Sequence, residues 1–247
     1  MAIWQDPTDD LRLTDDRVHI WRANLNLPQE DIEGLIGLLS ADELARANKF
    51  RFAEHRNSFI ASRGILRQLL ANYLDLSPKN LEFGYSDRGK PLLAKANLAN
   101  IPLQFNVSHS HEYALFGFTW RNLIGVDIEY LREMKDAVKI ARRFFSEREF
   151  KFISSFDLQQ QPRVFFKHWT AKEAYLKAIG VGLTGSLASI EIALDRAENA
   201  SIIAIDDNKA TTTGWSMYSC SPASDYVGAI AIQTQITKQQ IDFWNWS

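Results

Sequence analysis

The sequence predicts an α+β fold made of two similar halves, and three observations carry this prediction. Helical and strand-like segments occur in roughly equal measure along the 247 residues. Segments of the same kind recur in the same order about 110 residues apart. Finally, 46% of the residues are hydrophobic, which is enough to fill a core and excludes a disordered chain. We expect residues 1–123 and 124–247 to form halves related by a pseudo-two-fold axis, with the active site in the cleft between them.

The repeat is visible in three pairs of segments. Residues 18–21 match 126–129 at an offset of 108, residues 59–70 match 168–179 at an offset of 109, and residues 110–114 match 223–227 at an offset of 113. Each match is weak alone. Their common order and similar offsets favour duplication of a whole small domain, because the offset is longer than the period of a solenoid repeat.

Each half is predicted to contain a strand, then helices, then further strands. In the first half we expect strands at 18–21, 81–85, 105–107 and 113–119, helices at 42–52 and 57–74, and a turn at 87–91. In the second half we expect strands at 124–130, 190–194, 215–219 and 226–234, and helices at 136–145, 147–156 and 162–179. The polar residues 154–161 are expected to form a loop.

Charge and composition narrow the class of protein. The formal net charge of −2 does not suit a generic nucleic-acid binder. The single cysteine, Cys220, cannot form an intrachain disulfide or a multi-cysteine zinc site, which fits a reducing compartment. Residues 1–10 contain no Lys or Arg, unlike a secretory signal, and the longest apolar stretches, 113–120 and 226–232, are far shorter than the roughly 20 residues that span a bilayer. We expect a cytoplasmic protein that binds neither nucleic acid nor a membrane.

Two predicted helices carry a cation on their apolar face. On a helical wheel Lys172 and Glu173 fall among apolar residues of one helix, and Arg63 does so on the helix that the repeat matches to it. Burying a charge costs several kcal/mol unless the charge is paired or meets a ligand. If the halves pack about a two-fold axis, Arg63 and Lys172 would form a cationic pocket for phosphates. Alternatively, Lys172 extends to solvent and Glu173 pairs with Lys177.

Residues 125–129, Gly-Val-Asp-Ile-Glu, predict a strand with two carboxylates on one face. Because side chains alternate along a strand, Asp127 and Glu129 lie on the same side, roughly 6.6 Å apart. Such oxygen ligands suit Mg²⁺, although a solvated acidic edge strand would look the same. Together with a cationic pocket, the carboxylates indicate phosphoryl-transfer chemistry.

Residues 105–111, Phe-Asn-Val-Ser-His-Ser-His, place hydroxyls and histidines after a predicted strand end. Ser108 and His109 can donate hydrogen bonds to phosphate there, and Lys90 in a Gly-Lys-Pro turn adds positive charge. Zinc is disfavoured, because no third ligand accompanies His109 and His111 at a recognisable spacing. No P-loop and no G-x-G-x-x-G motif follows a strand, so the ordinary nucleotide-binding folds have no support.

Four motifs in this order resemble those of the Sfp-type 4′-phosphopantetheinyl transferases, the pseudosymmetric branch of that superfamily. The sequence is similar to the family's G-K-P motif at 89–91, F-N-x-S-H-S at 105–110, G-x-D-x-E at 125–129 and W-[S/T]-x-K-E-[S/A]-x-x-K at 169–177. The similarity spans nearly the whole chain, and four ordered motifs are far more specific than G-x-D-x-E alone.

The resemblance implies transfer of the 4′-phosphopantetheine arm of coenzyme A to a serine of an apo acyl or peptidyl carrier protein, with release of 3′,5′-ADP. It implies that Asp127, Glu129 and Glu173 bind Mg²⁺, for which Mn²⁺ can substitute. Glu173, directly or through a water on the metal, would be the base, and Lys177 would neutralise or protonate the leaving phosphate. The phosphates of coenzyme A would be held by Arg46, Arg63, Lys90, Ser108, His109, Lys172 and Lys177. We also expect a monomer.

Two positions depart from the family pattern. Glu43 stands where some relatives have a basic residue, which leaves the contacts to the adenosine end open, and His111 stands where glycine is frequent. Residues 132–145 predict a helix with one basic side, formed by Arg132, Lys135, Lys139, Arg142 and Arg143. Carrier proteins of this class are generally acidic near the modified serine, so this side either steers them or is merely solvated.

Two other functions would use the same residues. A Mg²⁺-dependent phosphohydrolase would need neither coenzyme A nor a protein acceptor. A non-enzymatic module would bind coenzyme A or a carrier protein and keep the acidic residues for structure alone. Activity with a purified carrier protein separates the three. Which carrier proteins are modified does not follow from the sequence.

Overall fold

The computed structural model describes residues 2–8, 11–86, 89–94, 103–181, 187–194, 200–205 and 214–247. The first half contains strands β1 (Val18–Asn24), β2 (Phe83–Tyr85), β3 (Pro91–Leu93), β4 (Leu103–Ser110) and β5 (Tyr113–Trp120), and helices α1 (Gln29–Ile36), α2 (Ala41–Ala47) and α3 (Ala53–Leu74). The second half contains strands β6 (Ile124–Tyr130), β7 (Ile190–Leu194), β8 (Ala200–Ile205), β9 (Ser216–Cys220) and β10 (Tyr226–Ile232), and helices α4 (Ala137–Phe144), α5 (Glu147–Ser154) and α6 (Gln161–Ile179). A last strand, β11 (Ile241–Asn245), follows.

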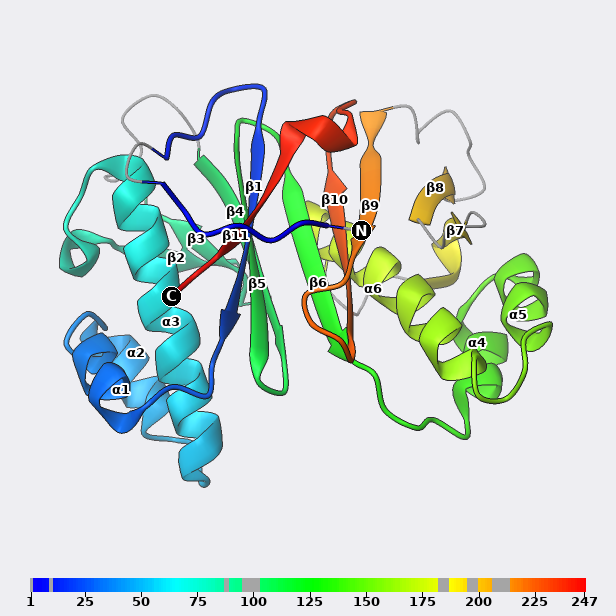
Figure 1. The fold of residues 1–247 in the computed structure, drawn as a ribbon, viewed down its shortest axis with the longest axis horizontal. Helices are drawn as coiled ribbons and strands as arrows, with labels where there is room; N and C mark the ends of the chain where they lie inside the picture. The colour runs from blue at the N-terminus through cyan, green and yellow to red at the C-terminus, as the bar shows by residue number, and fades with distance from the viewer. Residues whose placement is uncertain are drawn as a thin grey trace.

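Two sheets form the centre of the molecule (Figure 1). The first has the strand order β11-β1-β5-β4 and the second has the order β6-β10-β9, and β2-β3 and β7-β8 form short hairpins. Neighbours are antiparallel except β11, which pairs in parallel with β1. The last strand therefore crosses from the second half into the first sheet. The boundary between the halves at residues 123 and 124 stays a prediction. The structure adds that β11 crosses this boundary to pair with β1.

Helices cover the outer face of each sheet, which gives four layers (Figure 1). One apolar cluster lies between α1–α3 and the first sheet, and another lies between the second sheet and α4–α6. A third cluster joins the two sheets and includes Ile20, Leu115, Val126 and Ile230. Because side chains alternate along β6, burying Val126 between the sheets turns Asp127 and Glu129 toward α6.

The α+β class is confirmed, and most expected elements are present. Helix α2 ends at Ala47 instead of residue 52, and α3 begins at Ala53 instead of residue 57. The expectation that Ser108 and His109 follow a strand end was wrong, since β4 continues to Ser110. Helix α1 and strands β8 and β11 were not predicted. Within the described residues, no helix has the length and apolar character needed to span a membrane.

The expected turn at residues 87–91 is described only in part. The backbone N–H of Gly89 donates to the Ser86 carbonyl, and that of Ser86 donates to the Lys90 carbonyl. Gly89 has a φ of 78°, a conformation that glycine adopts without strain. Asp87 and Arg88, like Asp9 and Asp10 at the start of the chain, lie outside the described residues.

The internal repeat holds at a slightly different offset. Strand β1 begins at Val18 and β6 at Ile124, an offset of 106. Helices α3 and α6 both end in a left-handed residue, Asp75 and Gly180, an offset of 105. The offset of 109 expected for these helices was therefore wrong. The first-half counterpart of Lys172 is Arg67, not Arg63.

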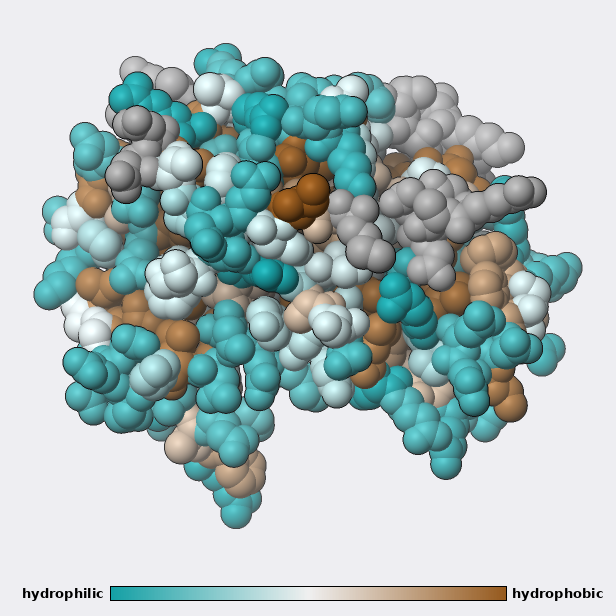
Figure 2. All heavy atoms as spheres, in the orientation of Figure 1, coloured by the Kyte–Doolittle hydropathy of each residue, from teal (hydrophilic) through white to brown (hydrophobic). Residues whose placement is uncertain are grey.

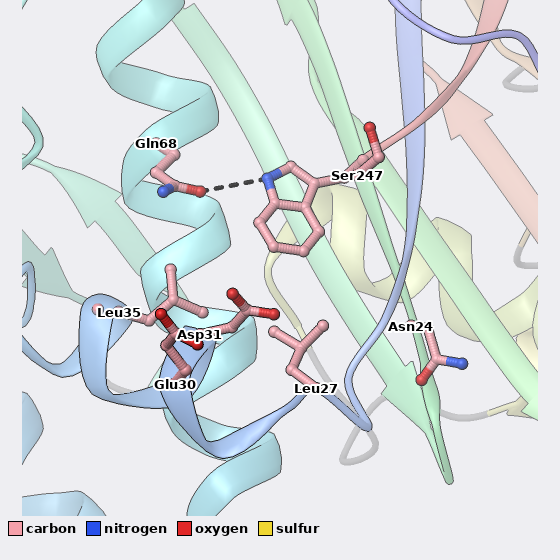
Figure 3. A pocket seen from close by; sticks show the side chains of 9 residues that line it. Asn24, Leu27, Glu30, Asp31, Leu35, Gln68 and Ser247 are labelled. Atoms are coloured by element: carbon pink, nitrogen blue, oxygen red, sulfur yellow. Dashed lines mark hydrogen bonds between the residues drawn. The ribbon is translucent and has the colours of Figure 1, made fainter.

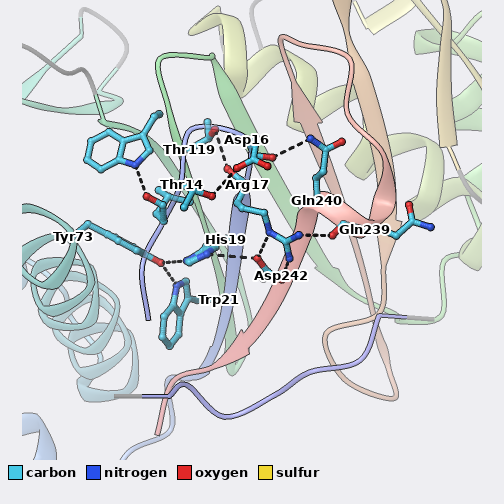
Figure 4. A network of polar contacts seen from close by, with 12 residues as sticks. Thr14, Asp16, Arg17, His19, Trp21, Tyr73, Thr119, Gln239, Gln240 and Asp242 are labelled. Atoms are coloured by element: carbon cyan, nitrogen blue, oxygen red, sulfur yellow. Dashed lines mark hydrogen bonds and ion pairs between the residues drawn. The ribbon is translucent and has the colours of Figure 1, made fainter. Parts of the chain in front are cut away.

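A polar network ties β11 to β1 and α3 (Figure 4). Arg17 forms two hydrogen bonds to the Asp242 carboxylate, one of them from Nε at 2.8 Å. The Tyr73 hydroxyl accepts from Trp21 Nε1 at 2.7 Å and contacts His19 Nδ1 at 2.8 Å. Since this hydroxyl can donate to an unprotonated Nδ1, the network suits a neutral His19. Burial lowers the pKa of His19 to about 4, although Asp242 opposes this shift.

We expect the protein to lose stability between about pH 6.5 and pH 4. An unfolded histidine takes up its proton near pH 6.5, whereas folded His19 resists protonation until about pH 4, so acid favours the unfolded chain. The loss from this residue is at most about 3 kcal/mol. Denaturant unfolding of wild type and His19→Asn at several pH values measures it. The slope of the unfolding free energy against pH should become shallower in His19→Asn. It should stay unchanged in the control His55→Asn, which replaces an exposed histidine.

Candidate active site at the junction of the halves

Three carboxylates approach one another where α6 packs on β6. Asp127 and Glu129 come from β6 and Glu173 comes from α6. Gly125 makes this close packing possible, because a Cβ atom there would lie 1.9 Å from the Ala174 carbonyl oxygen. The helix backbone thus fills the space beside Gly125. Any larger residue would push α6, and Glu173 with it, away from β6.

A cation from α6 and a hydroxyl from β4 meet the same carboxylate. Lys177 Nζ lies 2.6 Å from Asp127 Oδ1 and donates to Ser108 Oγ at 2.7 Å. Ser108 Oγ in turn donates to Asp127 Oδ1 at 2.8 Å. Both halves therefore contribute to one small polar cluster, which contains Ser108, Asp127 and Lys177.

Burial and neighbouring negative charge raise the pKa of two of the carboxylates. Burial, followed by the charge of Asp127, raises the pKa of Glu173 to about 7. Burial and Asp127 also raise the pKa of Glu129, against the effect of a hydrogen bond from Ser110. Glu173 therefore exchanges a proton near neutral pH, as a general base should.

The donor atoms of this cluster fit a divalent cation, although they do not enclose one. Asp127 Oδ2 and Glu173 Oε1 are buried and have no hydrogen-bond partner within the described residues. Oxygen atoms of this kind are the ligands that Mg²⁺ takes in proteins. Among the same residues, no three His, Cys, Asp or Glu side chains converge closely enough to hold a metal. Lys177 balances the charge of Asp127 in this arrangement.

Lys90 reaches from the first half to the C-terminal end of α6. Its Nζ donates to the carbonyl of Lys177 at 2.7 Å and to that of Ala178 at 3.3 Å. A cation at this end of a helix is favoured by unpaired carbonyls and by the helix dipole. Burial lowers the pKa of Lys90 to about 8. Lys90 thus lies beside Lys177, the residue that contacts Asp127.

Other predicted coenzyme A residues lie on the first half. Arg46 is exposed, with its guanidinium over the Phe59 ring. Arg63 is buried over the rings of Phe59, Phe83 and Tyr85, and burial lowers its pKa. His109 follows Ser108 on β4, is exposed, and points away from Ser108 by strand alternation. Arg63 Nε also lies 3.8 Å from Glu43 Oε1, so part of its charge is already balanced inside the first half.

The expectation that Lys172 points into the cleft and holds a phosphate is wrong. Lys172 is fully buried, and its Nζ lies 2.8 Å from Glu149 Oε2. It also donates to the carbonyls of Leu187, at 2.7 Å, and Ile190. Since an ammonium has three N–H groups, all of them are used inside the second half. No shared pocket with Arg63 forms.

The first half contains the same buried pair. Arg67 Nε donates to Glu43 Oε2 at 2.7 Å, and Arg67 Nη1 donates to the carbonyls of Pro78 and Leu81. Glu43 and Glu149 each close a capping box at the start of their own helix, with Ser40 and Ser146. The departure at Glu43 is therefore structural: its carboxylate neutralises a buried arginine.

We expect Lys172→Ala to destabilise the protein by about 3–5 kcal/mol, because it leaves the buried Glu149 carboxylate without its cation. Chemical denaturation without any ligand measures the loss. Lys135→Ala, which removes a lysine that is 86% exposed, is the control and should change stability by less than about 0.5 kcal/mol. Equal stability of the two variants would contradict the assignment of Lys172 to the interior.

Among the described residues of the first half there is no second copy of the carboxylate site. The repeat places Trp21 where β6 has Asp127 and Gln68 where α6 has Glu173. Gln68 lines a pocket of about 440 Å³ that the end of the chain partly covers (Figure 3). There Trp246 Nε1 donates to Gln68 Oε1 at 3.2 Å. An indole and an amide cannot replace two carboxylates.

Sequence reasoning assigned no role to three residues that the structure brings into the site or its support. Asn106 and Ser110 of β4 hydrogen-bond to β6, and Glu149 neutralises Lys172. Asn106, Ser108 and Ser110 alternate along the strand, which was a readable signal that they share one face. The Ser146-x-x-Glu149 pattern is a capping box that can be read from the sequence.

Comparison with known proteins shows the family of this chain. A family model described as "4'-phosphopantetheinyl transferase superfamily" matches residues 123–231, and one described as "4'-phosphopantetheinyl transferase, N-terminal" matches residues 26–118. The chain is 42% identical to the 4′-phosphopantetheinyl transferase HetI of Nostoc sp., over 93% of each chain. It is 36% identical to a putative 4′-phosphopantetheinyl transferase of Synechocystis sp., over 69% of this chain and 68% of that one. It is 28% identical to the 4′-phosphopantetheinyl transferase gsp of Aneurinibacillus migulanus, over 88% and 90%.

Proposed function

We propose that the reaction of this chain takes place at the junction of β4, β6 and α6. The chain belongs to the 4′-phosphopantetheinyl transferase superfamily and transfers the 4′-phosphopantetheine arm of coenzyme A to carrier proteins. One observation carries the location. Buried carboxylate oxygens without partners lie beside a lysine and a serine at this junction. An acidic cluster next to fixed cations is the composition that phosphoryl transfer needs.

Asp127, Glu129 and Glu173 would hold the metal, for which we propose Mg²⁺, with Mn²⁺ as a substitute. A bound divalent cation supplies charge that polarises phosphate oxygens and makes the phosphorus easier to attack. Carboxylate oxygens are the donors that such an ion prefers, and burial, with the charge of Asp127 as the second cause, raises the pKa values of Glu129 and Glu173. A bound cation would offset both effects.

The residues of this chain then have separate tasks. Glu173 is the proposed base for the proton of the carrier serine, because it faces Asp127 from α6 and, without a bound cation, has a pKa of about 7. Lys177, no longer needed by Asp127, stabilises the negative charge on the departing phosphate. Ser108 contacts both side chains and keeps them in place. No covalent enzyme intermediate is required.

We place coenzyme A along the first half, toward the junction. Arg46, Arg63, Lys90, Ser108, His109 and Lys177 remain the proposed phosphate contacts, whereas Lys172 is withdrawn. Arg46 and Arg63 lie over aromatic rings, which gives this surface both positive charge and flat apolar faces. Glu43 contributes no contact to the adenosine end, since it is buried against Arg67.

Carrier proteins would approach over α4 and the residues just before it. The helix begins at Ala137 and not at residue 132, so Arg132 and Lys135 precede α4, whereas Lys139, Arg142 and Arg143 lie on it. Arg132, Lys135, Lys139, Arg142 and Arg143 are all exposed. Figure 2 shows hydrophilic side chains mixed with hydrophobic ones over this region, at the lower right of the view. Phe144 and Phe152 belong to the exposed apolar part. An acidic partner with a small apolar contact suits such a surface. We propose that the enzyme acts as a monomer.

We expect Glu173→Gln to reduce carrier modification at least about a hundredfold, the lower range for a lost general base. The melting temperature without metal, measured at pH 8, should stay equal or rise. Folding raises the pKa of Glu173 to about 7, so the ionised group opposes folding above that pH and its removal does not destabilise. Intact-mass analysis of apo carrier proteins incubated with coenzyme A and Mg²⁺ measures transfer.

The control for this variant is Glu133→Gln, which neutralises a carboxylate that is 82% exposed and should leave transfer unchanged. Mg²⁺ should raise the melting temperature of wild type and of Glu133→Gln, but less that of Glu173→Gln. Undiminished transfer by Glu173→Gln would refute the site. Consumption of coenzyme A without modification of any carrier would favour a phosphohydrolase.

We expect the double reversal Lys135→Glu and Lys139→Glu to lower the efficiency of carrier modification without changing affinity for coenzyme A. Exposed charges steer association, and their effect is screened beyond about 8 Å at physiological ionic strength, so the variant should also lose salt dependence. Rates at varied carrier concentration and two ionic strengths measure this. The control, Lys79→Glu with Lys238→Glu, has the same charge change elsewhere. If both double variants behave alike, this basic surface is only solvated.

A further inference from the structure

Strands β4 and β6 lie side by side although they belong to different sheets. Each is the edge strand of its own sheet, and the described part of the chain has no backbone ladder between them. An edge strand exposes unpaired N–H and C=O groups, and buried groups of this kind need partners. The partners here are side chains of β4.

Three alternate residues of β4 contact β6. Asn106 Oδ1 accepts from the backbone N–H of Val126 at 2.8 Å. Ser108 Oγ donates to Asp127 Oδ1 at 2.8 Å. Ser110 Oγ accepts from the backbone N–H of Tyr130 at 3.1 Å and donates to Glu129 Oε2 at 3.0 Å.

The spacing of these contacts matches the geometry of both strands. Side chains two residues apart on β4 share one face, and N–H groups alternate between the two edges of β6. Val126 and Tyr130 therefore direct their N–H groups to the same edge, away from β10. The two backbone contacts flank the β6 carboxylates, since the contact at Val126 lies before Asp127 and the contact at Tyr130 lies after Glu129.

These contacts determine the register of β6 against β4. A shift by one residue would exchange the two faces of β6 and turn Asp127 and Glu129 away from α6. It would also leave the Val126 N–H without its acceptor in a place where Asn106 is only 4% exposed. Asn106 and Ser110 therefore hold the carboxylates in the one register that faces Glu173.

We infer that Asn106 and Ser110 are positioning residues for the transfer reaction. Asn106 acts on the backbone of β6, and Ser110 acts on both the backbone and the Glu129 carboxylate. Neither needs to touch coenzyme A or the carrier serine. This inference rests on the proposed function, because it concerns the alignment of the proposed metal ligands.

The main test uses Asn106→Leu, which keeps the size of the side chain and removes the acceptor. Amide hydrogen exchange at Val126 should become about tenfold faster, the factor that corresponds to one net hydrogen bond. The rate at saturating carrier should fall, and the Mg²⁺ concentration for half-maximal rate should rise, while KM for the carrier stays unchanged. Asn106→Asp, which keeps an acceptor oxygen, should retain the protection of Val126.

Gln104→Leu is the matched control. Gln104 lies two residues before Asn106 on β4, and within the described residues no hydrogen bond joins it to β6. This variant should leave exchange at Val126 and the Mg²⁺ dependence as in wild type. If Asn106→Leu does not fold, Ser110→Ala provides the test, with faster exchange at Tyr130 and the same change in Mg²⁺ dependence.

Unchanged exchange and unchanged Mg²⁺ dependence in the folded variants would overturn the inference. Faster exchange with normal Mg²⁺ dependence and rate would also overturn it, because Asn106 would then serve structure alone. Failure of the proposed function looks different. In that case wild type would modify no carrier protein, whereas the exchange at Val126 would still respond to Asn106→Leu.

Discussion

The buried ion pair between Lys172 and Glu149 fixes the rotation of α6, and the site depends on that rotation. All three N–H groups of the Lys172 ammonium are used inside the second half. Turning the helix would leave a buried charge unpaired, at a cost of several kcal/mol. Because consecutive helical residues are about 100° apart, fixing Lys172 toward α5 directs Glu173 toward β6. Lys172 thus stabilises the fold, and its neighbour Glu173 belongs to the proposed site.

The first half contains the same type of buried ion pair, but its residues at the positions of the proposed site differ. Arg67 is paired with Glu43 and with two carbonyls of the turn that follows α3, as Lys172 is paired after α6. The residues that face the sheet differ, with Gln68 in the position of Glu173. The pair that orients the helix is thus present in both halves, whereas the carboxylates occur in one. The first half instead supplies β4, whose side chains align β6.

The sequence was sufficient for the fold class, the long helices and the carboxylates, because these depend on periodicity and on short motifs. The sequence was insufficient to predict where the Lys172 side chain lies. A cation on an apolar face signals either a ligand or a buried partner, and the partner, Glu149, lies on another helix 23 residues earlier, counted from 149 to 172. Strand β11 was missed because its pairing with β1 links residues more than 200 positions apart, such as Val18 and Ile241. Long-range pairs of this kind leave no local pattern.

The carboxylate cluster is the part of the molecule that folding explains least. Elsewhere buried charges such as Glu149 and Arg67 have several partners, and Glu43 Oε1, which accepts no hydrogen bond within the described residues, still lies 3.8 Å from Arg63 Nε. Asp127 Oδ2 and Glu173 Oε1 have no hydrogen-bond partner within the described residues. Buried oxygens without partners cost stability, and like charges raise each other's pKa. Lys177 contacts Asp127 Oδ1 and Arg132 lies 3.7 Å from Glu129 Oε2, yet the pKa values of Glu129 and Glu173 stay raised, because burial outweighs these cations. A sequence selected for stability alone would not keep this arrangement, which is consistent with the metal site that we propose.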